Sequence, residues 1–136
     1  MQRIEFTGSE RHTWAGMGDF LLVSPDGKHQ VELIYDGEPP HGDSYHRATI
    51  DGSAYPGHIW GCMFGFSSCS RYLAFSAMPE KFERRTSVVD LLASRYFLLP
   101  DYIYQFDFSW PILSGEGTKY DGLSFIFDGR ERWIQF

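Results

Sequence analysis

The stretch richest in groups that could do chemistry is "EPPHGDSYH", residues 38–46, where two carboxylates and two imidazoles fall within nine residues. Glu38, His41, Asp43 and His46 are all of the types that ligate divalent metal ions. Their spacing matches no established ligand framework, and the prolines and glycine between them are typical of a polar surface loop. A surface loop is therefore the preferred interpretation.

His46 has a different position if the run "YHRATI", residues 45–50, forms a strand. Alternation along that strand places His46 on the same face as Ala48 and Ile50. We therefore expect no metal ion and no other cofactor here. A small metal- or ligand-binding β-fold enzyme that uses the His41–His46 loop is the alternative.

Cys69 is a second candidate, because it stands beside Arg71 in the probable turn "SSCSR" and a nearby guanidinium lowers a thiol pKa. No glycine-rich oxyanion loop and no cysteine–histidine motif accompanies it. A disulfide with Cys62 requires their strands to fold back on each other, and two cysteines are far from a disulfide scaffold. We expect neither a catalytic thiol nor a disulfide.

Paired carboxylates for glycoside hydrolysis would need an acid in an apolar strand context, which raises its pKa. Glu32 in "QVELIY" and Asp107 in "QFDFSW" have such neighbours, but alternation turns both side chains to the solvent face. The glycines are dispersed among the turns and form no phosphate-binding loop. The chain is therefore predicted not to be an enzyme.

The elements that would position these groups are short strands separated by turns. Turn chemistry recurs at residues 25–28, 36–43, 51–57, 114–117, 121–122 and 128–129. Strand-like runs occupy residues 3–6, 19–24, 29–35, 45–50, 58–67, 72–78, 86–92, 95–100, 102–108, 123–127 and 132–136. Short strands at a spacing of about ten residues predict an all-β domain.

The segment closest to a helical pattern is "TSVVDLLASRYFLL", residues 86–99, with Thr86 as a possible N-cap. Val88–Val89 and Tyr96–Phe97 favour strands. We therefore predict a hairpin that turns at residues 92–94.

A turn-and-strand unit recurs along the chain. "FLLVSPDGKHQVEL", "MFGFSSCSRYLAFS" and "QFDFSWPILSGEGTKYDGLSF" align at Ser24, Ser67 and Ser109, spaced by 43 and then 42 residues. That period is typical of four-stranded propeller blades. Together with "SVVDLLASR", these phrases resemble blades of the tryptophan–aspartate and TolB-like propeller families, in which an "SPDG" turn and a "V-x-D-L-x-x-G-R" hairpin follow one another.

The length of the chain restricts what this resemblance implies. Closed propellers need four or more blades, and 136 residues hold barely three units of this period. The prediction is one domain over residues 1–136, an antiparallel β-sandwich or a short blade-like stack of β-meanders that does not close into a propeller.

Composition narrows the class of partner. The formal charge of −6 argues against nucleic acid and against an anionic membrane surface. Acidic residues concentrate in residues 12–57 and basic residues in 71–95. The N-terminal sequence contains no apolar signal core and no run reaches transmembrane length, so a cytoplasmic location is expected.

Small size, acidic loops and abundant aromatic residues are similar in kind to small bacterial toxin-immunity proteins, although no motif identifies such a family. The resemblance implies a protein-binding module that occludes a cognate toxin with a basic surface. Carboxylates would steer the association and aromatic side chains would anchor it. The predicted partner-binding residues are Asp36, Glu38, Asp43, Tyr45, Asp51, Tyr55 and Trp60.

Overall fold

Strands make up most of the secondary structure in the computed structural model, which describes residues 1–8, 13–14, 17–38, 44–81 and 83–136. The elements are β1 (Gln2–Glu5), β2 (Thr13–Trp14), β3 (Phe20–Val23), β4 (Gln30–Gly37), β5 (Tyr45–Ile50), β6 (Ser53–Ala54), β7 (His58–Phe66), β8 (Tyr72–Met78), β9 (Arg85–Asp90), β10 (Arg95–Leu98), β11 (Phe106–Ser109), β12 (Ile112–Gly115), α1 (Gly117–Tyr120), β13 (Ser124–Ile126) and β14 (Ile134–Gln135). Within these ranges, no helix has the length and apolar character needed to span a membrane. The all-β prediction is confirmed.

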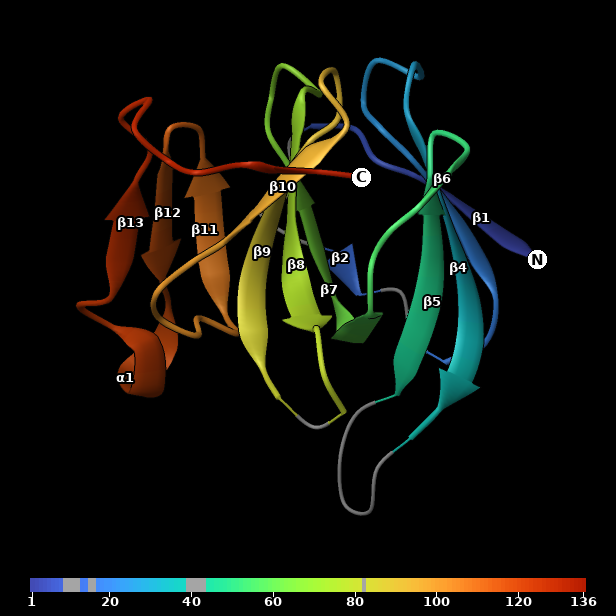
Figure 1. The fold of residues 1–136 in the computed structure, drawn as a ribbon, viewed down its shortest axis with the longest axis horizontal. Coiled ribbons are helices and arrows are strands. Elements are labelled where there is room, and N and C mark those ends of the chain that lie inside the picture. Colours follow the sequence, from blue (N-terminus) through green and yellow to red (C-terminus); the bar gives the residue numbers. More distant parts are fainter. Residues whose placement is uncertain (9–12, 15–16, 39–43, 82) are drawn as a thin grey trace.

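The strands form two open sheets (Figure 1). The larger sheet has the order β1-β3-β4-β5-β7-β8-β9-β10-β14, with β2 added to β7 and β6 added to β5, and the smaller sheet is β11-β12-β13. The strand pairs of the described residues are antiparallel except β1 with β3, which run parallel at one edge of the larger sheet. Neither sheet closes on itself, as predicted.

The larger sheet bends between β5 and β7, where only two residue pairs join the strands, Tyr45 with Trp60 and His46 with Ile59. Its halves therefore face each other, and the molecule has three layers. Layer one is β1, β3, β4 and β5, layer two is β7 to β10, and layer three is β11 to β13 (Figure 1).

Two apolar cores hold the layers together. The core between layers one and two includes Leu22, Val31, Leu33, Ile50, Phe64, Leu73, Phe75 and Val89. The core between layers two and three includes Tyr72, Ala74, Val88, Ile103, Phe106, Phe108 and Leu113. Every residue of β8 is buried, because one face of that strand lies in each core. Layers one and three each keep one face on solvent.

The repeated unit has a structural counterpart in the turns after β3 and β7. Ser24 N donates to His29 O at 3.0 Å, and Ser67 N donates to Tyr72 O at 2.8 Å. The serine hydroxyls also act alike, because Ser24 Oγ accepts from His29 N at 3.1 Å and Ser67 Oγ accepts from Tyr72 N at 3.0 Å. Residues 43 apart in the sequence thus build the same turn.

The remaining positions of the two turns also correspond. Gly27 has φ 74° and Ser70 has φ 64°, so a serine adopts the left-handed conformation that a glycine adopts in the first turn. Asp26 and Cys69 occupy the position before them: Ser24 Oγ donates to Asp26 Oδ1 at 2.6 Å, and Ser67 Oγ lies 3.3 Å from Cys69 Sγ.

The third copy departs from this pattern. Ser109 is exposed at the end of β11, and the two residues Trp110 and Pro111 connect β11 directly to β12. Layer three therefore has three strands, and a two-residue connection replaces the turn that spans residues 24–29 and 67–72 in the first two units. The short helix α1 lies between β12 and β13.

The hairpin predicted over residues 86–99 is confirmed, with β9 and β10 pairing in antiparallel register around residues 91–94. Ser94 has φ 50° at the position where the blade motif has glycine. The carboxylate of Asp90 accepts from Ala93 N at 3.4 Å, which stabilises the turn.

The strand expected over residues 102–108 is shorter than predicted, since β11 begins at Phe106. Ile103 is buried, and a side chain in place of a neighbouring strand supplies the hydrogen bonds of its backbone groups. Its amide donates to Thr86 Oγ1 at 2.7 Å, and the same hydroxyl donates to Ile103 O at 3.1 Å. One threonine therefore satisfies both backbone groups of this residue.

Candidate functional site

The predicted partner-binding acids do not lie together. Asp36 is near the end of β4 and Glu38 follows that strand, whereas Asp51 follows β5 at the other end of the β4–β5 hairpin. The strand pairing between them spans several residues at about 3.3 Å per residue. Asp43 lies outside the described residues.

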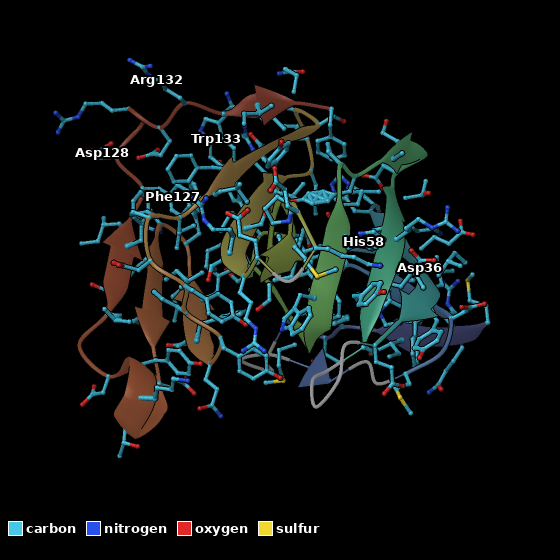
Figure 2. All side chains as sticks on the ribbon, turned by 60° about the horizontal axis from the view of Figure 1, so that its bottom comes forward. Asp36, His58, Phe127, Asp128, Arg132 and Trp133 are labelled. Atoms are coloured by element: carbon cyan, nitrogen blue, oxygen red, sulfur yellow. The ribbon has the colours of Figure 1, made fainter. Side chains whose placement is uncertain are left out.

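Asp36 is already paired within the chain. Its Oδ2 lies 2.7 Å from His58 Nε2 and 3.7 Å from Arg47 Nε. The hydrogen bond with His58, followed by the positive charge of Arg47, holds the pKa of the Asp36 carboxyl below its ordinary value. Figure 2 shows Asp36, in β4, close to His58, the first residue of β7, with β5 between the two strands in the sheet order.

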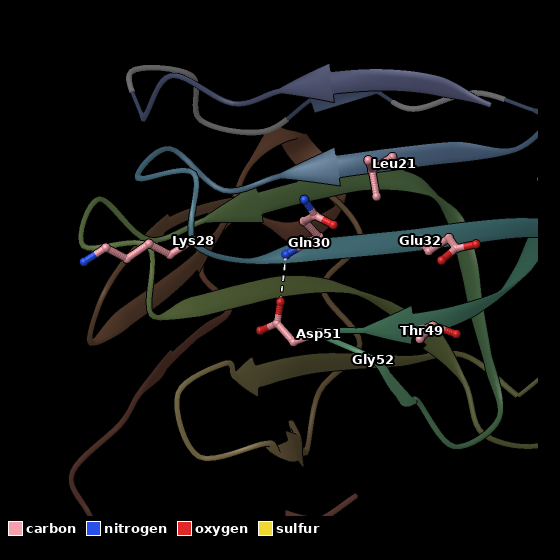
Figure 3. Close-up of a pocket in the computed structure, with 7 residues that line it drawn as sticks. All are labelled: Leu21, Lys28, Gln30, Glu32, Thr49, Asp51 and Gly52. Carbon is pink, nitrogen blue, oxygen red and sulfur yellow. Dashed lines mark hydrogen bonds between the residues drawn. The ribbon is translucent and has the colours of Figure 1, made fainter.

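Asp51 has a structural role in the turn between β5 and β6, where it adopts φ 48°. Its Oδ1 accepts from Gln30 N at 2.8 Å (Figure 3). Its Oδ2 lies 2.7 Å from His29 Nδ1. The carboxylate thereby extends the hydrogen bonding of β5 and β4 past the end of the strand pair.

Glu38 accepts a hydrogen bond from the Tyr35 hydroxyl at 2.9 Å, and this bond raises the pKa of Tyr35. Tyr35 is itself 37% exposed, and its amide donates to Asp19 Oδ1 at 2.9 Å. Asp19 and Glu38 are both exposed, so carboxylates flank an accessible tyrosine at this end of β4.

Two of the three predicted aromatic anchors, Tyr45 and Trp60, lie in strands β5 and β7 and are buried. They form a small third core with Met78. The Arg84 guanidinium covers the Trp60 ring at 4.6 Å from its centroid. Neither ring is exposed as an anchor, because the two residues are cross-strand partners at the joint between β5 and β7 and both are buried.

Tyr55 is also buried, in the core between layers one and two. Its hydroxyl lies 2.8 Å from Ser87 Oγ, and its ring contacts Phe75 edge-on with centroids 5.2 Å apart. Burial raises the pKa of this phenol well above its ordinary value. Tyr55 therefore lies in the core and is not exposed as an anchor.

His46 lies on the face of Ala48 and Ile50, as alternation predicts, and is completely buried. Its Nε2 lies 2.8 Å from Gly18 O, whereas its Nδ1 has no hydrogen-bond partner among the described residues. Burial lowers the pKa of this imidazole, so the neutral form is favoured. His46 is thus enclosed in the protein and is not presented by a loop.

The remaining members of the proposed metal loop, His41 and Asp43, lie outside the described residues. Within the ranges that the structure covers, no group of three or more histidine, cysteine, aspartate or glutamate side chains is placed to hold a metal ion. The enzyme alternative therefore has no geometric support from His46.

Cys69 is exposed and its thiol is free, so it forms no disulfide with Cys62. Its position in the second repeated turn explains its neighbours: the thiol contacts Ser67, just as the carboxylate of Asp26 contacts Ser24. Cys69 is therefore a residue of the second repeated turn, at the position that Asp26 occupies in the first.

The outer face of layer one brings together residues that no single loop contains. Cross-strand pairing places Leu21, Glu32, Thr49 and Ala54 in one row across β3, β4, β5 and β6. The outer face is defined by the side chains of Arg3, Glu5, Leu21, Gln30, Glu32, Ile34, Asp36, Arg47, Thr49 and Ala54.

This outer face is hollowed in two places that share Thr49. The larger hollow, of about 540 Å³, is lined by Leu21, Lys28, Gln30, Glu32, Thr49, Asp51 and Gly52 (Figure 3). The smaller, of about 300 Å³, is lined by Ile34, Arg47, Ala48, Thr49, Ala54, Tyr55 and Gly57. Both hollows open to solvent, and both have apolar side chains beside charged ones.

Glu32 and Lys28 differ from Asp36 and Asp51, whose carboxylates are already paired within the chain. Within the described part of the chain, neither side chain forms a hydrogen bond or an ion pair. Both line the larger hollow, so an anion and a cation are available there to groups from outside the protein. The sequence carried this signal, because the alternation in "QVELIYD" assigns Gln30, Glu32, Ile34 and Asp36 to one solvent-facing side of β4.

The chain was compared with protein-family models, with curated protein sequences and with solved structures, and none of the three comparisons found a match.

Proposed function

We propose that this chain is a non-catalytic protein-binding module and that the outer face of layer one is its contact surface. The observation that carries the proposal is the pair of adjoining hollows on one exposed sheet face, lined by half-buried Leu21 and Ile34 with charged side chains around them. Apolar centres with a polar rim are typical of protein–protein contact surfaces.

The charge of the molecule favours a partner with a basic surface. The net charge is −6, and Glu32, which forms no hydrogen bond or ion pair with the described residues, lies on the outer face with Asp36 on the same strand. Carboxylates so placed accelerate association with a basic protein and oppose association with an acidic one. The carboxylates of the outer face would thereby steer the partner toward it, and the apolar side chains of Leu21 and Ile34 would add affinity.

Within this class, the proposed partner is a bacterial toxin, and the chain is its immunity protein, acting in the cytoplasm by occluding the toxin. The support is the combination of small size, acidic charge and an all-β platform with an open face. This proposal moves the contact surface from the buried rings of Tyr45, Tyr55 and Trp60 to the outer face.

Co-expression with each protein that is encoded beside the gene of this chain, tested for toxicity to the host cells, tests the proposal. The expected result is protection of the host cells and a complex that survives gel filtration. Glu32→Lys should abolish protection, because it reverses an unpaired charge on the outer face without removing a contact within the chain. Asp121→Lys is the matched control, because Asp121 is exposed and follows α1 in layer three.

The result that contradicts the proposal is equally specific. If both charge-reversal variants protect as well as the unmodified protein, the outer face is not the contact surface. If the unmodified protein neither protects nor forms a complex with any neighbouring gene product, the toxin proposal is wrong.

A further inference from the structure

Two arginine side chains converge on one buried carboxylate at the end of layer two. Arg71 binds Asp90 through two hydrogen bonds, Nε to Oδ1 at 3.0 Å and Nη2 to Oδ2 at 3.1 Å. Arg95 Nε donates to the same Oδ2 at 3.0 Å. Since both nitrogens contact one oxygen, Arg71 Nη2 and Arg95 Nε lie at most about 6 Å apart.

The carboxylate is inaccessible, whereas the guanidiniums are not. Asp90 is completely buried, but the side chains of Arg71 and Arg95 are 40% and 33% exposed. Burial alone would raise the pKa of Asp90, and the hydrogen bonds from both arginines outweigh it and hold that pKa below its ordinary value. One negative charge therefore faces two positive charges, which leaves an excess of one positive charge at the surface.

Both guanidiniums keep unused donors. An arginine has five N–H groups, and Asp90 engages only Nε and Nη2 of Arg71 and Nε of Arg95. No other hydrogen bond of these two guanidiniums lies within the described part of the chain. Stacking on aromatic rings occupies the faces of a guanidinium and leaves its edges free for hydrogen bonds.

Aromatic rings hold the two arginines in place. Arg71 lies over Tyr72 at 5.3 Å and Arg95 lies over Trp133 at 4.8 Å from the ring centroids. Aromatic rings in contact connect these two supports. A closed cycle of contacts runs through Asp90, Arg71, Tyr72, Trp110, Phe127, Trp133 and Arg95. Figure 2 shows Phe127 and Trp133 together at this end of the molecule.

We infer that Arg71 and Arg95 form a binding subsite for an oxyanion, the carboxylate or phosphate group of a small ligand. Forked guanidinium donors match the geometry of such groups, and the cycle of contacts fixes them before a ligand arrives, which lowers the entropy cost of binding. The subsite belongs to layer two and is separate from the outer face of layer one, so it does not depend on the proposed partner.

The test is a titration of the ¹⁵N-labelled protein with inorganic phosphate and, separately, with acetate, at constant ionic strength maintained with chloride. The Nε–Hε resonances of Arg71 and Arg95 should shift and saturate with at least one of the two anions, while those of Arg3 and Arg47 should not. A response to phosphate alone, to acetate alone or to both then identifies which kind of oxyanion the subsite binds. Each of these three outcomes supports the subsite.

Two variants sharpen the result. Arg95→Gln should raise the dissociation constant of the anion at least tenfold. Arg3→Gln, which removes an exposed arginine of layer one, should leave that constant unchanged. If Arg95→Gln does not fold, the titration of the unmodified protein decides the matter. The inference is overturned if neither anion produces a saturable shift, or if folded Arg95→Gln binds as the unmodified protein does.

Discussion

The amide of Asp26 donates a hydrogen bond to the hydroxyl of Ser70 at 3.0 Å, and this bond joins the two repeated turns of the chain. The residues are 44 positions apart, and each belongs to the turn that ends the first strand of its unit. The repeated serine pattern therefore has an energetic role as well as a geometric one, because the two copies stabilise each other directly.

Cys69→Asp should increase stability, because it gives the second turn the carboxylate that the first turn has in Asp26. In the first turn, Asp26 accepts from Ser24 Oγ and from Lys28 N. The expected gain is about 0.5–1 kcal/mol in the free energy of unfolding, measured in urea. Asp26→Cys is the reciprocal control and should lose a similar amount; stabilisation by that change would contradict the correspondence.

Ser94→Gly should stabilise the β9–β10 hairpin by about 1 kcal/mol, because Ser94 adopts φ 50° and glycine has no penalty there. Its hydrogen bond to Phe136 uses the backbone carbonyl and is retained. Ser68→Gly is the matched control, since Ser68 is an exposed turn residue whose φ is not positive, and it should be neutral or destabilising. Equal effects of the two changes in urea unfolding would refute the explanation.

Asp90→Asn should cost about 3 kcal/mol at neutral pH, because it leaves Arg71 and Arg95 without their shared counter-ion. The pKa of Asp90 is lower in the folded state than in the unfolded chain, where it is near 3.9. Its contribution to the free energy of unfolding is therefore fully present above the unfolded pKa and is lost as the pH falls through the folded pKa. Urea unfolding between pH 2.5 and 7 should show a smaller acid loss in the variant. Parallel curves for both proteins would show that Asp90 does not titrate as inferred.

His46→Leu should reduce the loss of stability on mild acidification. Burial lowers the pKa of His46 below its ordinary value of 6.5, so the unfolded chain binds a proton that the folded chain resists. Stability is therefore lost as the pH falls below about 6.5. Thermal unfolding at several pH values from 7.5 to 5 measures the difference, and an unchanged slope in the variant would exclude His46 as its source.

Trp110→Ala should loosen layer three from layer two, because the Trp110 ring stacks on Tyr72 at 3.5 Å and contacts Phe127 at 4.7 Å. The expected cost is roughly 3 kcal/mol. Hydrogen exchange should accelerate in β11, β12 and β13 more than in β3 and β4. Ile126→Ala is the control, because Ile126 is 61% exposed in the same layer; uniform acceleration in both sheets would contradict a layer-specific effect.

Alternation and turn chemistry were sufficient to predict the architecture. Strands β3, β4, β5 and β7 to β10 lie where β-rich runs separate Asp-Gly and Ser-rich turns, whereas β6 lies inside the segment 51–57 that was predicted as a turn. His46 and Glu32 face the sides that period-two alternation assigns to them. The parallel strand β1 was not predictable in this way, because its pairing with β3 depends on how the chain crosses between the two strands.

The site required information that local patterns do not contain. Whether Tyr45 and Trp60 are exposed depends on the joint between β5 and β7, which buries both rings. Asp36 meets His58 across that same joint, 22 residues later in the chain. The motif containing Asp90 and Arg95 was visible in the sequence, but its second arginine, Arg71, comes from the preceding hairpin.

The narrow joint between β5 and β7 has a consequence for the order in which the chain folds. Most strand pairs join neighbours in the sequence, so the hairpins on either side of the joint form from local contacts at low entropy cost. The pairs β2 with β7 and β10 with β14 connect distant segments and must wait for those hairpins. We therefore expect the two halves of the larger sheet to fold as separate units, and their docking across the core between layers one and two to be the step that commits the chain to its native topology.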